Sequence, residues 1–140
     1  MSFSLNIPLA MPLAISAIYA SILALFLIIL AVPVIMLRCG LRVGLGDGGH
    51  RSLQQAIRAH GNAAEFIPIF IVLLAILELN RGPAWALHAF GIAFLLARLA
   101  HAGGLYVSTG HTSGRAAGVL GTFTVLVLLA GANLWQVIAR

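Results

Sequence analysis

The chain has 140 residues, of which 61% are hydrophobic and only 8% are charged, and its mean hydropathy is +1.08. A soluble domain carries roughly a quarter charged residues, so this composition excludes a soluble enzyme, a disordered protein and a disulfide scaffold. The net charge of +5 comes from scattered arginines without a basic patch, which argues against a nucleic-acid partner. The single cysteine, Cys39, excludes an intrachain disulfide. An integral membrane protein is the class that remains.

Four apolar stretches each approach the ~20 residues that one helical crossing of a bilayer needs. The first contains Pro8, Pro12 and Pro33, which should trim its start and bend its end, because proline lacks an amide donor. It is too long for a cleaved signal peptide and no basic residue precedes it, so we expect a retained anchor. We therefore predict an all-α integral membrane protein, a single domain over 1–140 folded as an up-down bundle of four transmembrane helices. The expected spans are about 9–37, 54–79, 83–106 and 115–138.

The arginines predict how the four spans are oriented. Both termini and the loop at Arg81 share one side of the membrane, and the two long loops share the other. Two arginines, Arg81 and Arg140, fall on the first side and six on the second. Because an excess of positive charge marks the cytoplasmic side, we expect both long loops in the cytoplasm and both termini opposite. The six are Arg38, Arg42, Arg51, Arg58, Arg98 and Arg115.

Polar side chains form a column on the second predicted helix. At about 100° per residue they share one narrow stripe, in which Arg58 and Glu65 are spaced by seven. One interpretation is structural: Arg58 and Glu65 pair across two turns, and Asn62 bonds to a neighbouring helix. The other is a binding site, because ionisable residues at membrane depth usually line a cavity or contact a substrate. The column has more polar groups than one packing contact requires, and it consists of Arg51, Gln54, Arg58, Asn62 and Glu65.

Two further polar features lie near the second of the two long loops, which connects the third and fourth apolar stretches. Arg98 and His101 stand three residues apart among small residues, which lets another helix come close. His101 fits a packed histidine as well as a ligand-binding one. The fourth stretch opens with the sequence GRAAG at 114–118, whose arginine is Arg115. Arg115 either extends to lipid phosphates or stabilises a thiolate or another developing anion.

Two apparent motifs, for nucleotide binding and for metal binding, do not indicate a functional site. The loop at 44–49 matches G-x-G-x-x-G, but an apolar span precedes it where a nucleotide site needs a buried strand, so we interpret it as a flexible turn. The five histidines are spread over four segments without a metal-binding spacing, and we predict no metal site.

Residues 58–68, RAHGNAAEFIP, fit the pattern R-x-[HQ]-x-N-x-x-E-[YF]-x-P. This segment resembles the signature of the MAPEG family, the membrane-associated proteins in eicosanoid and glutathione metabolism. The family includes microsomal glutathione transferases, prostaglandin and leukotriene synthases, and a non-enzymatic lipoxygenase-activating protein. The likeness covers the whole chain and is greatest to a small bacterial branch. It implies a multi-pass protein of the bacterial inner (plasma) membrane.

The resemblance also implies a homotrimer that binds glutathione as co-substrate between protomers, together with a lipophilic second substrate or lipid. Arg115 corresponds to the catalytic arginine that stabilises the thiolate. Phe66 and His101 stand where relatives usually have tyrosine, so phenolic donors are missing. The column, the pair on the third stretch and the resemblance together predict the substrate-binding residues. These are Arg38, Arg51, Arg58, His60, Asn62, Glu65, Phe66, Arg98, His101 and Tyr106.

The expected activity is that of a glutathione-dependent transferase or peroxidase acting on hydrophobic electrophiles in the membrane. Arginines suit the carboxylates of glutathione through bidentate pairing, and Glu65 suits its amine. The alternative is a non-catalytic lipid-binding or scaffolding membrane protein, in which the polar column holds the trimer together. A transporter is disfavoured, because the chain shows no internal repeat.

Overall fold

The computed structural model describes residues 12–107 and 112–139. These residues form four α-helices, each long and apolar enough to cross a membrane. The prediction of an all-helical chain with four helices able to span a membrane is therefore confirmed. The helices are α1 (Ala14–Leu41), α2 (Arg51–Leu79), α3 (Ala84–Val107) and α4 (Ser113–Ile138).

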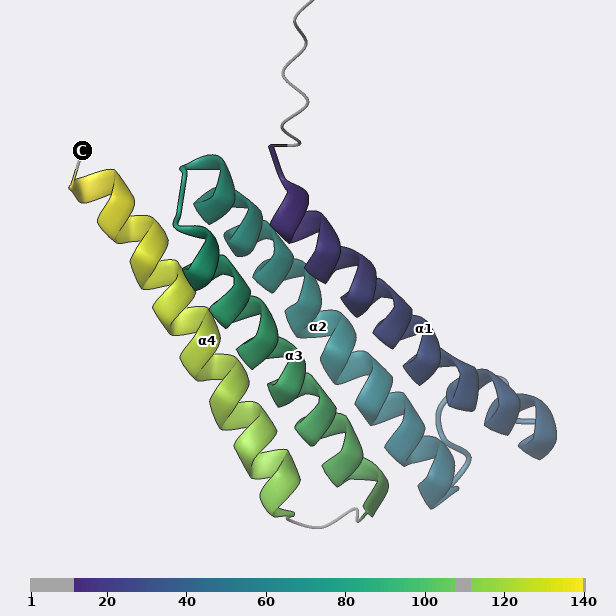
Figure 1. The fold of residues 1–140 in the computed structure, drawn as a ribbon. Coiled ribbons are helices and arrows are strands. Elements are labelled where there is room, and N and C mark those ends of the chain that lie inside the picture. Colours follow the sequence, from purple (N-terminus) through teal and green to yellow (C-terminus); the bar gives the residue numbers. More distant parts are fainter. Residues whose placement is uncertain (1–11, 108–111, 140) are drawn as a thin grey trace, which may run out of the picture.

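The four helices run alternately up and down, as the order of the spans predicted (Figure 1). The start of α1, the turn between α2 and α3, and the end of α4 lie at one end of the bundle, which we call the terminal end. The connection from α1 to α2 lies at the other end, which we call the loop end, together with the end of α3 and the start of α4. Helices α2 and α3 are central, because each of them contacts all three other helices.

The helix bounds differ from the expected spans by a few residues. Helix α1 continues past Pro33 to Leu41 and ends where Arg42 adopts a left-handed conformation, with a φ of 55°. Its last turns lie away from the other helices in Figure 1. Helix α2 begins at Arg51, a few residues before the predicted span. The prediction followed the apolar stretch, whereas the helix also includes a more polar first turn. Pro8 and the start of the first predicted span lie outside the described residues.

Large apolar side chains fill the interior between α2 and its neighbours. The rings of Phe70 and Phe94 stack with centroids 3.9 Å apart, joining α2 to α3. Leu23, Leu74 and Leu129 are fully buried around them. Many other large apolar side chains lie on the outer faces of the helices. An apolar exterior of this kind suits lipid, since lipid tails solvate it as well as a protein interior does.

Polar contacts hold the terminal end together. The carboxylate of Glu78 accepts hydrogen bonds from the backbone N–H groups of Ile15 at 2.9 Å and Ser16 at 2.7 Å. Glu78 thereby satisfies orphan donors in the first turn of α1, whose own N-cap residue makes no side-chain bond. Nearby, the hydroxyl of Tyr19 lies 3.1 Å from Nδ1 of His88. This cluster joins α1, α2 and α3 and accounts for the acidic residue at the end of α2.

Candidate binding site

The polar column lies on the outward face of α2. Arg51, Gln54, Arg58 and Glu65 are exposed, and Asn62 is half-buried. Charged side chains at membrane depth are costly when they face lipid, so this face is suited to a ligand or to a second copy of the chain. The opposite face of α2 is buried and apolar, and it contains Leu53, Ala56, Ala59, Ala63 and Ile67.

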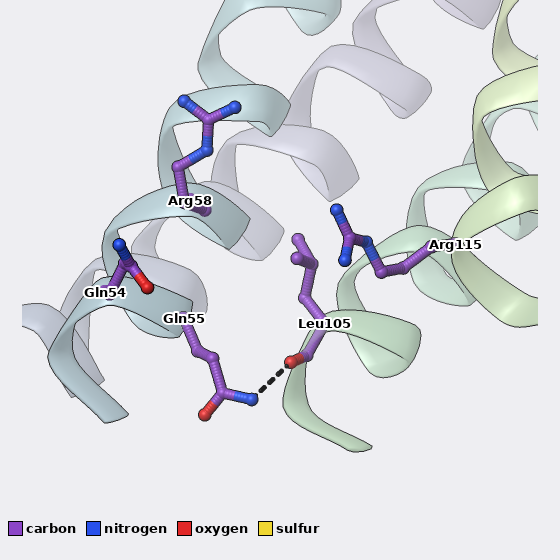
Figure 2. A pocket seen from close by; sticks show the side chains of 5 residues that line it. All are labelled: Gln54, Gln55, Arg58, Leu105 and Arg115. Carbon is purple, nitrogen blue, oxygen red and sulfur yellow. Dashed lines mark hydrogen bonds between the residues drawn. The ribbon is translucent and has the colours of Figure 1, made fainter. Parts of the chain in front are cut away.

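A cavity of about 300 Å³ opens at the loop end of the column, and we call it the arginine cavity. Its walls come from three helices: Gln54, Gln55 and Arg58 from α2, Leu105 from α3 and Arg115 from α4. Arg115 extends over Leu105 from the side opposite α2 (Figure 2). The Nε2 group of Gln55 donates to the carbonyl oxygen of Leu105 at 2.9 Å, so that bond joins α2 to α3 beside the cavity.

The position of Arg115 is set by the way α4 begins. Thr112 is the N-cap residue, and its hydroxyl accepts a hydrogen bond from the backbone N–H of Arg115 at 3.3 Å. The same hydroxyl donates to the carbonyl oxygen of Gly104 at 3.1 Å, which ties the start of α4 to α3. A Cβ atom on Gly104 would lie 2.5 Å from the backbone nitrogen of Arg115, so only glycine permits this approach. These contacts therefore fix the backbone of the first turn of α4, which carries the Arg115 side chain.

The composition of the arginine cavity favours an anion. Two arginines, Arg58 and Arg115, line it together with two glutamines, and no acidic residue is among its lining residues. Guanidinium groups pair with carboxylates through two parallel hydrogen bonds. The cavity can thus bind a carboxylate or a comparable oxyanion.

A second cavity of about 240 Å³ continues along the polar column, and we call it the column cavity. It is lined by Ile57, Arg58, Gly61, Asn62 and Glu65. Arg58 lines both this cavity and the arginine cavity, so the two lie next to each other. A cation, an amide and a carboxylate on one wall match a ligand that carries both an anionic and a cationic group.

A third cavity of about 410 Å³ lies on the other side of Arg115, and we call it the apolar cavity because most of its lining is apolar. His101, from α3, is buried there, and its Nδ1 atom lies 3.4 Å from the carbonyl oxygen of Arg115. Arg115 is shared with the arginine cavity and therefore stands between a polar and an apolar space. The lining residues are His101, Thr112, Arg115, Ala116, Val119, Leu120 and Phe123.

Arg98 lies inside the bundle, away from the walls of these three cavities. Only 2% of its surface is exposed, and its guanidinium donates to Asn62 Oδ1 at 2.7 Å and to Thr122 Oγ1 at 2.5 Å. The ring of Phe66 lies beside it, with 5.5 Å from the guanidinium carbon to the ring centroid. Arg98 and Phe66, both predicted to bind substrate, are thus placed behind the polar column.

Four other predicted site residues do not line the cavities at Arg58 or Arg115: Arg38, Arg51, His60 and Tyr106. Arg38 donates to the carbonyl oxygens of Val43 at 3.3 Å and Gly44 at 3.1 Å, and lines a separate cavity at the end of α1. His60 is half-buried on α2, and Tyr106 is 45% exposed on α3. The roles predicted for all of the site residues, including those that line the cavities, stay predictions.

Sequence reasoning missed several residues that build the site. Gln55 lies within about 60° of Arg58 on the helix, so the periodicity that identified the column contained a signal for it. Leu105 and Thr122 carried no such signal, because their contributions depend on contacts between helices.

Comparison with known proteins gives a family match and two similar proteins. The model of the MAPEG family matches residues 16–135. The chain is also similar to the inner membrane protein YecN of Escherichia coli K12 and to YecN of an O6:H1 strain of the same species. Each is 43% identical over 121 residues, which cover 86% of this chain and 91% of the relative.

Proposed function

This chain belongs to the MAPEG family, and on that premise we propose that it is a glutathione-dependent transferase or peroxidase acting on hydrophobic electrophiles in the membrane. The observation that carries the proposal is the arginine cavity, whose lining includes Arg58 from α2 and Arg115 from α4. It adjoins the apolar cavity through Arg115. A charged thiol compound and an apolar partner would meet there.

Glutathione offers groups that suit the two polar cavities. Its carboxylates match the guanidinium of Arg58 and the neighbouring glutamine amides of the arginine cavity. Its amine matches the carboxylate of Glu65 in the column cavity. Because Arg58 lines both cavities, one extended peptide would contact both groups.

Arg115 would supply the chemical step. A guanidinium near the sulfur stabilises the thiolate, which is the nucleophilic form of a thiol. In a transfer reaction the thiol proton is lost to water, the sulfur bonds to the electrophilic carbon, and the leaving group departs with its electron pair. In a peroxidase reaction two glutathione molecules and one hydroperoxide give glutathione disulfide, an alcohol and water.

The electrophile would occupy the apolar cavity. Val119, Leu120 and Phe123 lie on α4 on the same side as Arg115 and give this space its apolar wall. The cavity lies on an outer surface that we expect lipid to cover, so a lipophilic substrate would enter it from the bilayer.

We further propose that the protein is a homotrimer in the inner membrane, with both long loops in the cytoplasm. The exposed polar column supports assembly, because a neighbouring copy would cover charged groups that lipid solvates poorly. The matching relatives are named as inner membrane proteins, which supports the location. The excess of arginine at the loop end supports the orientation.

The first test is the thermal stability of the purified protein in detergent, with and without millimolar glutathione. A ligand that binds only the folded state stabilises it, by about 2.7 kcal/mol at a hundred times its Kd. We expect a higher Tm with glutathione, and no such rise in Arg58→Ala. Arg81→Asn is the matched control, because it removes an exposed arginine at the terminal end. Asparagine is chosen because it tolerates the positive φ of 62° at this position. A wild-type Tm that is the same with and without glutathione would contradict the proposal.

A second candidate function is a non-catalytic lipid-binding or scaffolding protein. The exposed face of the polar column favours it, because the same groups would serve an interface between copies. It predicts that Glu65→Ala breaks the oligomer in detergent while glutathione has no effect on the wild type. An oligomer that survives Glu65→Ala would count against this candidate.

A further inference from the structure

We propose that Arg98 is a positioning residue: it fixes the side-chain amide of Asn62 so that Asn62 presents its NH2 group, a hydrogen-bond donor, to the ligand in the column cavity. The inference deepens the proposed function and rests on it for the identity of the ligand. The contact between Arg98 and Asn62 itself does not depend on that function.

The guanidinium of Arg98 is held between three helices. From α3 it reaches Asn62 on α2, and on α4 it reaches Thr122 Oγ1 at 2.5 Å and the carbonyl oxygen of Gly118 at 3.3 Å. Its Nε atom is buried and has no hydrogen-bond partner among the described residues. The guanidinium therefore has more donors than nearby acceptors, and it uses the oxygen of Asn62 as one of the few that are available.

This contact decides which end of the Asn62 amide faces inward. An arginine side chain has donors and no acceptor, so the atom 2.7 Å from its NH1 group must be the amide oxygen, as the structure has it. The oxygen and nitrogen of an amide lie on opposite sides of one carbon. With the oxygen bound to Arg98, the NH2 group is directed away from Arg98.

The consequence concerns the wall of the column cavity, which Asn62 lines next to Arg58 and Glu65. An NH2 group beside a guanidinium makes two neighbouring donors, which suit a carboxylate or carbonyl oxygen of the ligand. A flipped amide would instead turn its oxygen to such a group and repel it. Arg98 thus affects the choice of ligand without touching it, since it is 2% exposed.

A double-mutant cycle on the glutathione Kd separates positioning from a general structural role. We expect Arg98→Met to raise the Kd about tenfold, the loss that follows when one hydrogen bond to a charged group is weakened. In the Asn62→Ala background the same change should raise the Kd less than about twofold, because no amide remains to be oriented. Methionine removes the donors, and Thr122 keeps its own hydrogen bond to Gly118 at 2.7 Å.

Asn133→Leu is the matched control. Asn133 joins α4 to α2 through a bond from its Nδ2 group to the carbonyl oxygen of Leu73 at 3.0 Å, and the same group donates within α4 to the carbonyl oxygen of Leu129 at 3.0 Å. Leu73 lies about three helical turns from Asn62 on α2. The control should lower thermal stability and leave the glutathione Kd unchanged. Equal rises in Kd for Arg98→Met with and without Asn62 would overturn the inference.

Selective 15N labelling of asparagine gives a readout that needs no ligand. The chain has asparagine at positions 6, 62, 80 and 133, and the signals of the Asn62 NH2 group can be assigned by their loss in Asn62→Asp. We expect Arg98→Met to shift these signals and Asn133→Leu to leave them in place. Should the wild type fail to bind glutathione while this shift is seen, the orientation by Arg98 stands and only the proposed function falls. Unshifted Asn62 signals in Arg98→Met would overturn the inference whatever the ligand.

Discussion

The surroundings of Arg115 differ from one side of the residue to the other. On one side it lines a cavity with Arg58 and two glutamines, and on the other it lines a cavity of mostly apolar residues. Arg58, by contrast, is exposed and lines two polar cavities. Under the proposed function, this difference fits Arg115 to the chemical step and Arg58 to binding, so the two residues should respond differently to substitution.

Replacing Arg115 should affect the chemical step. We expect Arg115→Ala to lower kcat for conjugation of a chlorinated nitroaromatic by about 10²- to 10³-fold, the loss typical when one group that stabilises a developing anion is removed. Steady-state kinetics with glutathione as the varied substrate measure this directly. Arg115→Lys is the control, and it should recover part of the rate because it keeps the charge and loses the planar fork. Wild-type kcat in Arg115→Ala would refute the assignment.

Replacing Arg58 should affect affinity. Without a guanidinium to pair with a carboxylate, Arg58→Ala should bind glutathione about 10- to 100-fold more weakly. Since Arg58 is exposed, the Tm of the ligand-free protein should change little. Calorimetric titration of Arg58→Ala beside Arg81→Asn gives both values under one condition, and equal affinities in the two variants would argue against a role for Arg58.

At the scale of elements, the contact of α3 with α4 positions the site. Gly118 makes the close approach possible, because a Cβ atom there would lie 2.6 Å from the backbone nitrogen of His101 and 2.7 Å from the carbonyl oxygen of Ala97. The same approach brings the carbonyl oxygen of Gly118 to Arg98. The small residues that open α4 thus serve packing, whatever ligand the site binds.

Gly118→Ala should therefore destabilise the fold although alanine favours helices. We expect a loss of about 1–3 kcal/mol from overpacking, measured by thermal or detergent-induced unfolding. Gly131→Ala on the same helix is the matched control, because no atom lies within 4 Å of its added Cβ. That variant should be more stable by about 0.5–1 kcal/mol. Similar effects at both positions would show that the packing of Gly118 is unimportant.

Over the whole molecule, the two ends of the bundle differ in chemistry. The loop end holds the arginine cavity and, at the end of α1, a separate cavity lined by Arg38 and Arg42. At the terminal end, the carboxylate of Glu78 and the contact between Tyr19 and His88 join α1, α2 and α3. This asymmetry matches the orientation proposed from charge, with the site open to the cytoplasm, where a soluble thiol would reach it.

The exposed Cys39, at the loop end, allows that orientation to be measured. A membrane-impermeant maleimide should label Cys39 in inverted membrane vesicles and leave it unlabelled in intact spheroplasts. The control is Cys39→Ser combined with Arg81→Cys, which moves the one thiol to an exposed position at the terminal end and should give the opposite result. Labelling of Cys39 in intact spheroplasts would reverse the proposed orientation.

The sequence alone determined the helical class and the existence of the polar column. The length of an apolar stretch reflects the thickness of a bilayer, and the spacing of Arg51, Arg58 and Glu65 places them on one face of a helix whatever lies around it. The pattern from Arg58 to Pro68 also indicated the family that the comparison then showed. All of these are properties of single segments.

Only the tertiary structure decided how those segments face one another. From the sequence, Arg98 is predicted to bind substrate and Arg115 to stabilise the thiolate, so both are expected to face the ligand. In the structure, Arg98 is buried against Asn62 and Arg115 lines two cavities. The difference arises because Gly104 and Gly118 allow α3 and α4 to pack closely, and that contact sets which side of each helix turns inward. The periodicity of one helix cannot specify this, since the rotation of a helix is set by the shapes of its neighbours.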